Sequence, residues 1–242
     1  EGDFPATVWD VTTGKMKFKL GGHQDYIAGV SFSPDGNAIV TSSGDSTARL
    51  WTADGQLVKE LRGHTKALAG AIFSPDGKFV VTASADNAVR VWDSLDGKLI
   101  TQFRGHSQAV NSVAFSADRQ FMVTASDDQT ARLWPFHPGE GASNRTIQSR
   151  EHSAGIASIA CSPNGSELAG TTPDGKLWLD GVGLQRSVPF SFLVDRSAKV
   201  ANVRFSPDGQ SIATTRGAVG VIYNIDTLRA FVDSTRSEFI YS

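Results

Sequence analysis

The repeating unit of this chain is clearest at residues 64–92, which read HTKALAGAIFSPDGKFVVTASADNAVRVW. Its FSPDG segment also occurs at 32–36 and 205–209, and altered copies, FSADR and CSPNG, stand at 115–119 and 161–165. Self-similarity of this kind is the first feature to examine in a sequence, because it determines how every other segment is interpreted.

The spacing inside the unit is constant, whereas the spacing between units varies. Three histidine–tryptophan pairs are each 28 residues apart: His23–Trp51, His64–Trp92 and His106–Trp134. In all three units the histidine also stands nine residues before the phenylalanine of the turn segment. The steps between successive histidines, counting His152 as the fourth, are 41, 42 and 46 residues. This pattern indicates a rigid structural unit connected to the next by a variable loop.

Each unit predicts four short β-strands. An apolar stretch at 67–73 suits a buried strand, and the Ser-Pro-Asp-Gly that ends at 77 is a turn, because proline presets φ and glycine accepts a positive φ. A β-rich run follows at 79–84, an alternating strand at 88–92 and a fourth strand at 98–103. Four antiparallel strands per unit predict an all-β chain built from β-propeller blades.

These units resemble WD repeats, whose signature is a Gly-His pair and a Trp-Asp pair about thirty residues apart. The resemblance covers nearly the whole chain and is closest between residues 1 and 135. It implies that hydrogen bonds tie each blade together, since a buried imidazole needs partners for both ring nitrogens. The matching sets are His23, Asp45 and Trp51; His64, Asp86 and Trp92; and His106, Asp128 and Trp134. The hydroxyl of each set would come from Thr41, Thr82 and Thr124 or, alternatively, from Ser43, Ser84 and Ser126.

No catalytic chemistry is predicted for these sets. A nucleophilic triad needs one constellation exposed in one cleft, whereas three copies at the same spacing indicate a structural role. The chain has no nucleophile-elbow, zinc-protease or phosphate-loop motif. The single cysteine, Cys161, excludes a cysteine-based zinc site and resembles a small core residue. We therefore predict no enzyme activity, no metal and no cofactor.

The later units depart from the pattern. Trp178 follows His152 by 26 residues instead of 28. In the last unit Arg196 stands at the histidine position, Gly217 at the aspartate position and Tyr223 at the tryptophan position. We do not expect the hydrogen-bonded set in that blade. These units also resemble the Ser-Pro-Asp-Gly repeats of other bacterial propellers.

The chain is interpreted as one propeller domain over residues 1–242, with a partial blade at 1–22 that lacks its first two strands. Five repeats follow, at about 23–63, 64–105, 106–151, 152–195 and 196–242. Two alternatives remain: a six-bladed ring closed by a depleted blade, or a piece of a larger propeller, which is preferred. An open end would expose unpaired strand edges, so self-association is a further possibility.

The expected function is binding of a protein or peptide. The net charge of −2 gives no electrostatic reason to expect nucleic acid or membrane partners. The resemblance implies contacts at the channel mouth, at positions near each histidine and each turn aspartate. The candidates are Tyr26, Asn111 and Asp127, with the small residues Ala28, Ala69 and Ala85. Tyr26 leads because aromatic anchors are enriched among binding hot spots.

The wider role stays open between three hypotheses. The first is an interaction scaffold or the sensor part of a larger signalling protein, and the second is a propeller accessory domain of a hydrolase or oligopeptidase. The third is a propeller fragment that self-assembles. The chain cannot form an internal disulfide, because it has one cysteine. This fits a reducing compartment, so a cytoplasmic location is expected.

Overall fold

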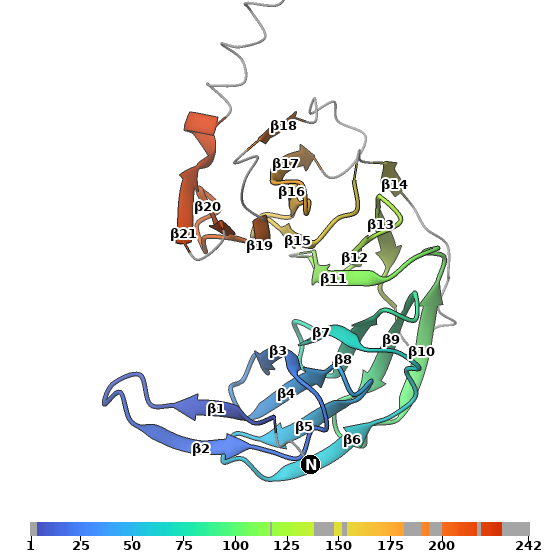
Figure 1. Cartoon of the computed structure of the whole chain (residues 1–242), viewed down its shortest axis with the longest axis vertical. Helices are drawn as coiled ribbons and strands as arrows, with labels where there is room; N and C mark the ends of the chain where they lie inside the picture. Colours follow the sequence, from blue (N-terminus) through green and yellow to red (C-terminus); the bar gives the residue numbers. More distant parts are fainter. Residues whose placement is uncertain are drawn as a thin grey trace, which may run out of the picture.

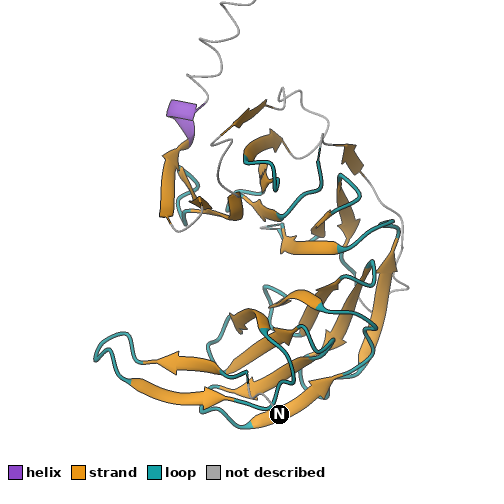
Figure 2. Cartoon of the chain, in the orientation of Figure 1, coloured by secondary structure: helices purple, strands orange, loops and turns teal. Residues whose placement is uncertain are grey.

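The computed structural model describes residues 4–116, 118–137, 148–151, 154–181, 190–193, 200–216 and 219–228. These residues form six antiparallel sheets, and a single helical turn at 225–228 follows the last strand (Figures 1 and 2). His152, Arg196 and Gly217 lie outside the described residues, so their predicted positions are not considered further.

Each sheet is made from strands that follow one another in the sequence. The first sheet pairs β1 (Ala6–Trp9) with β2 (Met16–Leu20). The second contains β3 (Ile27–Phe32), β4 (Ala38–Ser43), β5 (Ala48–Thr52) and β6 (Leu57–Leu61). The third contains β7 (Leu68–Phe73), β8 (Phe79–Ser84), β9 (Ala88–Asp93) and β10 (Leu99–Arg104).

The remaining three sheets repeat this order. The fourth contains β11 (Val110–Phe115), β12 (Phe121–Ser126), β13 (Thr130–Pro135) and β14 (Gln148–Glu151). The fifth contains β15 (Ser158–Cys161), β16 (Glu167–Thr171), β17 (Lys176–Gly181) and β18 (Phe190–Leu193). The sixth has three described strands, β19 (Val200–Phe205), β20 (Ser211–Arg216) and β21 (Val219–Asn224). The prediction of an all-β chain made of four-stranded antiparallel blades is confirmed.

The sheets follow one another along an open arc (Figure 1). The first strand of each four-stranded sheet lies on the concave side of the arc, and the fourth strand lies on its outer side. Neighbouring sheets contact each other mainly through these inner strands, β3 with β7, β7 with β11, β11 with β15, and β15 with β19. The β1–β2 sheet and the β19–β21 sheet end the arc on its open side, where they lie apart.

The hydrophobic core lies between successive sheets. Strand β8 reads FVVTAS, and five of its six residues are buried, because neighbouring sheets cover both of its faces. On one side Val81 packs with Val110 and Val113 of the next sheet, while Val80 packs with Leu50 of the preceding sheet. A strand buried on both faces is expected to be nearly continuously apolar, as β8 is.

The Ser-Pro-Asp-Gly segments form the turns between the first and second strands. In the third sheet the Asp76 carboxylate accepts hydrogen bonds from the Ser74 hydroxyl at 2.6 Å and from the Lys78 backbone N–H at 3.1 Å. Gly77 has a φ of 73°, which favours glycine over residues with a side chain. The turn therefore closes on its own polar groups and fixes the register of the two strands that it joins.

Candidate functional site

Three buried hydrogen-bonded sets join the strands of the second, third and fourth sheets. In the third sheet His64 Nδ1 lies 2.8 Å from Asp86 Oδ2, and His64 Nε2 lies 2.8 Å from the Thr82 hydroxyl. The indole N–H of Trp92 donates to the same hydroxyl at 2.9 Å. The set therefore links the segment before β7, strand β8, the β8–β9 turn and strand β9.

The other two sets have nearly the same geometry. His23 lies 2.8 Å from both Asp45 and Thr41, and the Trp51 indole donates to Thr41 at 3.0 Å. The equivalent distances to His106 are 2.8 Å from Asp128 and 2.7 Å from Thr124, with Trp134 donating to Thr124 at 2.8 Å. The structure thus brings together the residues that share each predicted set.

The threonine, not the neighbouring serine, supplies the hydroxyl. The Ser84 hydroxyl donates instead towards the backbone carbonyls of Lys66 and Ala67, both at 3.0 Å, and accepts from the Asp86 backbone N–H. Ser43 and Ser126 make equivalent bonds in their own turns. Residues two apart on a strand point to the same face, so the threonine and the serine of each strand share a face. They differ because the serine lies at the end of the strand, beside the turn.

The order of donors in each set follows from the chemistry of its groups. An ionised aspartate can only accept, so the proton of the imidazole sits on Nδ1 and Nε2 accepts from the threonine hydroxyl. The tryptophan N–H then donates to the threonine oxygen. The chain runs in one direction from indole to carboxylate, and each bond polarises the next.

This geometry resembles a Thr–His–Asp catalytic triad, but it cannot act as one. Thr41, Thr82 and Thr124 are fully buried, and all three histidines are buried as well. A nucleophile must reach its substrate, and here the hydroxyl is enclosed and already shared between an indole and an imidazole. The sets hold the sheets together and leave no exposed reactive group.

The imidazoles of His64 and His106 stay neutral near pH 7. Burial lowers the pKa of His64 and of His106 below the ordinary value of 6.5. Burial opposes ionisation of the aspartates, but hydrogen bonds from Thr47 and Thr130 hold the pKa of Asp45 and that of Asp128 at about 2. A neutral imidazole beside an ionised carboxylate is the state that the hydrogen bonds require.

We expect acidification to destabilise the protein. Below pH 6.5 the imidazoles of His64 and His106 take up protons in the unfolded chain before they do so in the folded one. The free energy of unfolding should therefore fall as pH falls below 6.5, by about 1.4 kcal/mol per pH unit for each imidazole until its folded-state pKa is reached. Urea unfolding at pH 7 and pH 5.5 measures this loss.

The matched control for this prediction is His137→Asn, since His137 is exposed and belongs to none of the sets. This variant should lose as much stability between the two pH values as the unchanged protein does. Equal stability of the unchanged protein at pH 7 and pH 5.5 would contradict the burial of neutral imidazoles.

Sequence reasoning missed an arginine that recurs beside each set. Arg49, Arg90 and Arg132 each stand two residues before the tryptophan and 26 after the histidine. A Cβ atom on Gly105 would lie 2.6 Å from the Arg132 guanidinium, and glycines 22 and 63 also approach their arginines. Each guanidinium thus packs on the glycine of the Gly-His pair, and the repeated spacing was the signal that could have found it.

The register of the fifth sheet explains the short spacing of Trp178. Trp178 pairs with Gly170, whereas Trp92 of the third sheet pairs with Val80, six residues after its turn serine. Six residues after Ser162 stands Leu168, which pairs with Asp180. Trp178 therefore occupies the position of the arginines, and Asp180 occupies that of the tryptophans. Because Gly170 is a glycine and has no Cβ atom, the indole ring of Trp178 fits against it.

The last sheet has a different arrangement at the equivalent positions. Tyr223 pairs with Ile212 and so occupies the tryptophan position. Thr214 stands where Thr82 stands in the third sheet, but its hydroxyl donates to the backbone carbonyl of Asn202 at 2.6 Å.

The predicted contact residues lie on the face of the His–Asp turns, and two of them contact each other. Asn111 Nδ2 donates to Asp127 Oδ1 at 2.6 Å and to the Ile156 carbonyl of the next sheet at 2.9 Å. Its amide therefore joins two sheets, while Asp127 remains exposed. Of the small candidates, Ala28 is exposed, and the other two, Ala69 and Ala85, are partly buried.

Tyr26 is the large exposed side chain among these candidates. It is 52 % exposed, and its ring lies against Gly44, where an added Cβ would come within 2.6 Å of the ring. Its backbone N–H donates to the Asp25 carboxylate at 2.7 Å. The ring is thus supported from below by the neighbouring turn and presents its outer side to solvent.

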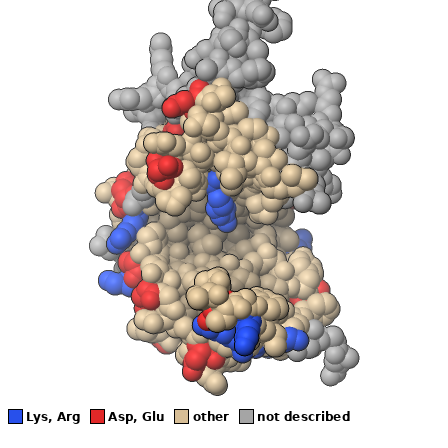
Figure 3. Space-filling model, turned by 90° about the vertical axis from the view of Figure 1, so that its left-hand side faces the viewer, with Lys and Arg blue, Asp and Glu red and all other residues tan. Residues whose placement is uncertain are grey.

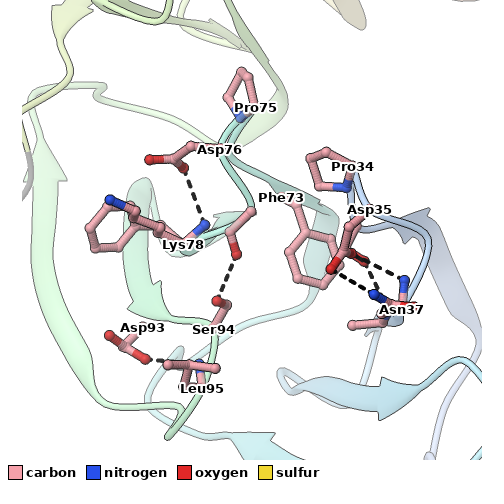
Figure 4. A pocket seen from close by; sticks show the side chains of 14 residues that line it. Pro34, Asp35, Asn37, Phe73, Pro75, Asp76, Lys78, Asp93, Ser94 and Leu95 are labelled. Carbon is pink, nitrogen blue, oxygen red and sulfur yellow. Dashed lines mark hydrogen bonds between the residues drawn. The ribbon is translucent and has the colours of Figure 1, made fainter.

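A second surface feature lies at the opposite end of the sheets. A pocket of about 600 Å³ separates the Ser-Pro-Asp-Gly turns of the second and third sheets. Figure 4 shows Pro34 and Asp35 of one turn across from Pro75 and Asp76 of the next, with Phe73 between them. The Asp35 carboxylate is engaged within its own turn, since it accepts from the Ser33 hydroxyl at 2.6 Å. The pocket is a product of two adjacent repeated turns.

The concave side of the arc is largely uncharged. Figure 3 looks into the open side and shows a hollow of mostly neutral surface, with a basic side chain in its upper part and other charged side chains gathered around its margins. In the part of the chain that the structure describes, no three His, Cys, Asp or Glu side chains are placed to hold a metal ion. No helix in the same residues is long and apolar enough to cross a membrane.

Comparison with known families matches the description "WD domain, G-beta repeat" to residues 14–52, 55–93 and 97–135. The chain carries WD40 repeats. Each matched WD40 segment begins near the fourth strand of one sheet and ends in the third strand of the next, so the sequence repeat overlaps two sheets.

Individual proteins resemble this chain over about one WD40 repeat. The guanine nucleotide-binding protein subunit beta of Saccharomyces cerevisiae is 46 % identical over 50 residues, which are 21 % of this chain and 12 % of that protein. WD repeat and SOCS box-containing protein 1 of Danio rerio is 42 % identical over 55 residues, 22 % of this chain and 13 % of that protein. THO complex subunit 6 of Arabidopsis thaliana is 44 % identical over 50 residues, 21 % and 14 % of the two chains. The matches thus cover only a small part of these relatives.

Proposed function

We propose that this protein is a non-catalytic interaction module that binds a peptide or protein segment on the face of the His–Asp turns. The observation that carries the proposal is the internal bonding of the buried polar groups. Each His–Asp–Thr–Trp set forms its hydrogen bonds within one sheet, so residues that bind a partner must lie on the surface. Two relatives have names that denote subunits of assemblies, which supports a protein as the partner.

Tyr26 is the proposed anchor of this surface. A half-exposed tyrosine ring held by Gly44 presents apolar area and a polar hydroxyl at little entropic cost. Around it, the exposed Ala28 and the partly buried Ala69 and Ala85 leave room for a bound segment. Because Asn111 joins two sheets, we assign it the role of holding this face rigid and place Asp127 at its rim.

In a larger signalling protein, such a face would serve as a sensor whose occupancy reports the presence of the segment. A cytoplasmic location is part of the proposal, motivated by a single cysteine that leaves the fold without an internal disulfide. The small, mostly uncharged surface favours a segment with apolar and neutral polar side chains over a strongly charged one.

Capture experiments with two matched variants test the proposal. Tyr26→Ala removes the anchor, whereas Leu95→Ala removes an even more exposed apolar side chain beside the pocket at the opposite end of the sheets. Truncating a hot-spot aromatic costs about 2 kcal/mol or more, which weakens binding about thirtyfold. We expect proteins captured by the unchanged chain to be lost with Tyr26→Ala and retained with Leu95→Ala. The reverse pattern would place the contact surface at the pocket.

A further inference from the structure

In the second sheet, the arginine beside the buried set is paired with a glutamate of the outer strand. The Arg49 guanidinium donates to the Gly21 carbonyl at 3.1 Å and to Glu60 Oε2 at 3.3 Å. The other carboxylate oxygen of Glu60 lies 2.6 Å from Nη2 of Arg62, an exposed arginine just past the end of β6. One carboxylate thus lies between two guanidinium groups.

The third sheet keeps both arginines but has a glutamine in place of the glutamate. Arg90 of β9 pairs with Gln102 of β10. In the second sheet the equivalent pair is Arg49 and Glu60. Arg104 stands two residues after the glutamine, as the second arginine does after the glutamate. Because glutamine has the shape of glutamate but no charge, the third sheet lacks the carboxylate between its two arginines.

Arg90 is buried without the partners that Arg49 has. It is 8 % exposed, and its Nε and Nη1 atoms are enclosed and have no hydrogen-bond partner among the described residues. Oδ2 of Asp86 lies 3.7 Å from Nη1, but this oxygen already accepts from His64 Nδ1 at 2.8 Å and from the Thr65 backbone N–H at 3.1 Å. A buried charged donor without an acceptor is costly, so Arg90 needs a further acceptor.

Arg104 also lacks a carboxylate partner. Among the described residues its guanidinium contacts the Gln102 amide oxygen, at a long 3.5 Å, and no carboxylate. A neutral oxygen at that distance compensates little of the charge. In the second sheet two arginines are matched by Glu60 and the turn residue Asp45, whereas in the third sheet Asp86 alone matches two arginines. The third sheet is therefore one negative charge short at this place.

We propose that Arg90 and Arg104 bind a carboxylate from outside the chain, at the place that Glu60 fills in the second sheet. A carboxylate supplies the one missing negative charge, whereas a phosphate dianion would exceed it. Guanidinium groups also match a carboxylate in shape, because each donates parallel hydrogen bonds to its oxygens. The Gln102 amide adds an N–H donor beside them. The carboxylate belongs to an acidic side chain of a bound polypeptide or to a small organic acid.

This site is separate from the surface around Tyr26. It lies between β9 and β10, in the outer half of the third sheet, whereas Tyr26 precedes β3, the inner strand of the second sheet (Figure 1). The Tyr26 surface is proposed to take a mostly uncharged segment, and the arginine site takes an acidic group. The inference therefore goes beyond the proposed function, and Tyr26→Ala should leave the arginine site intact.

NMR titrations of protein labelled with nitrogen-15 in its arginines test the proposal. The Nε–H resonance of Arg90 reports on the site, because this atom is enclosed and has no hydrogen-bond partner. The probes are sodium acetate and the capped peptide acetyl-Gly-Glu-Gly-amide, with acetyl-Gly-Gln-Gly-amide as the uncharged control. We expect both carboxylates to shift the resonance saturably and the glutamine peptide to leave it unchanged. Tighter binding of the glutamate peptide identifies a polypeptide as the source, and acetate binding as tightly identifies a small acid.

Exchanging glutamine and glutamate between the two sheets provides the sharpest variants. Gln102→Glu supplies the carboxylate from within the chain, so it should abolish the response of Arg90 to both probes. Glu60→Gln should create an equivalent site in the second sheet, seen as a new saturable shift of the Arg49 Nε–H resonance. Unchanged probe binding by Gln102→Glu would overturn the proposal.

Two arginine variants separate the site from the overall charge of the protein. Arg104→Gln should weaken probe binding at Arg90 about tenfold or more, because it removes one of the two charged donors. Arg62→Gln removes the equivalent exposed arginine of the second sheet and should leave binding at Arg90 unchanged. Equal weakening by both variants would overturn the proposal. So would the absence of a saturable shift with either carboxylate, or tighter binding of inorganic phosphate than of both.

Discussion

Replacing Trp134 with alanine should lower the free energy of unfolding by about 3–5 kcal/mol, the usual cost of truncating a buried aromatic side chain. Trp134 is fully enclosed, its ring centroid lies 5.5 Å from that of Phe103, and its N–H holds the Thr124 hydroxyl. Truncation removes this packing and one of the partners of the buried threonine. Urea unfolding followed by circular dichroism measures the loss.

The chain supplies its own control in Trp9→Ala. This residue has the same chemistry and the same position in its strand, but its side chain is largely exposed. Truncation at such a surface site should change the free energy of unfolding by about 0.5 kcal/mol. Equal losses for the two variants would show that the burial of the tryptophans does not differ between the first sheet and the fourth.

Replacing Thr82 with valine should destabilise the protein by about 2–6 kcal/mol, although the two side chains have nearly the same shape. The hydroxyl of Thr82 accepts from the Trp92 indole and serves the Nε2 atom of His64, both inside the protein. Without it, two buried polar groups lose their partner, and each costs about 1–3 kcal/mol to leave unpaired. The same urea unfolding experiment measures the effect.

Thr82→Ser separates the hydroxyl from the methyl group. Serine keeps the hydrogen bonds and loses one buried methyl, so a cost of about 1 kcal/mol is expected. If serine and valine were equally damaging, packing and not hydrogen bonding would explain the role of Thr82. Thr124 in the next sheet has the same surroundings and allows the pair of substitutions to be repeated.

The substitutions at Trp134 and Thr82 both test the contribution of the buried hydrogen-bonded sets to stability. Each of three consecutive sheets carries its own buried set, so rigidity is built into every repeat and does not depend on one central site. A rigid repeat holds its surface loops in place, and loops on a rigid scaffold are where binding residues concentrate. The proposed Tyr26 surface depends on that rigidity.

Much of the fold was predictable because it is repetitive and local. The turn segments, the alternating third strand and the constant histidine–tryptophan spacing predicted four-stranded antiparallel blades, and the structure confirms them. The resemblance to WD repeats, applied to that spacing, placed the members of each hydrogen-bonded set. The choice of Thr82 over Ser84 was left open, because both stand on one strand and only the course of the β8–β9 turn separates them.

Other features could not be found from spacing within one unit. The amide of Asn111, a predicted contact residue, reaches the Ile156 carbonyl, which lies 45 residues further along the chain. The position of Trp178 depends on its pairing with Gly170, which the histidine count could not reveal. Both depend on contacts or registers that a count along the sequence does not contain.

The sequence by itself determined the repeating unit, its strands and its turns, because these depend on local periodicity and on short, constant separations. The members of the buried hydrogen-bonded sets followed from the resemblance of these repeats to WD repeats. Only the tertiary structure decided which copies of the same residue are covered. Trp9 and Trp134 stand at the same position of the repeat, yet one is exposed and the other enclosed. The reason is that burial of a blade residue is provided by the neighbouring strands and sheets, whose presence and position are a property of the assembled arc.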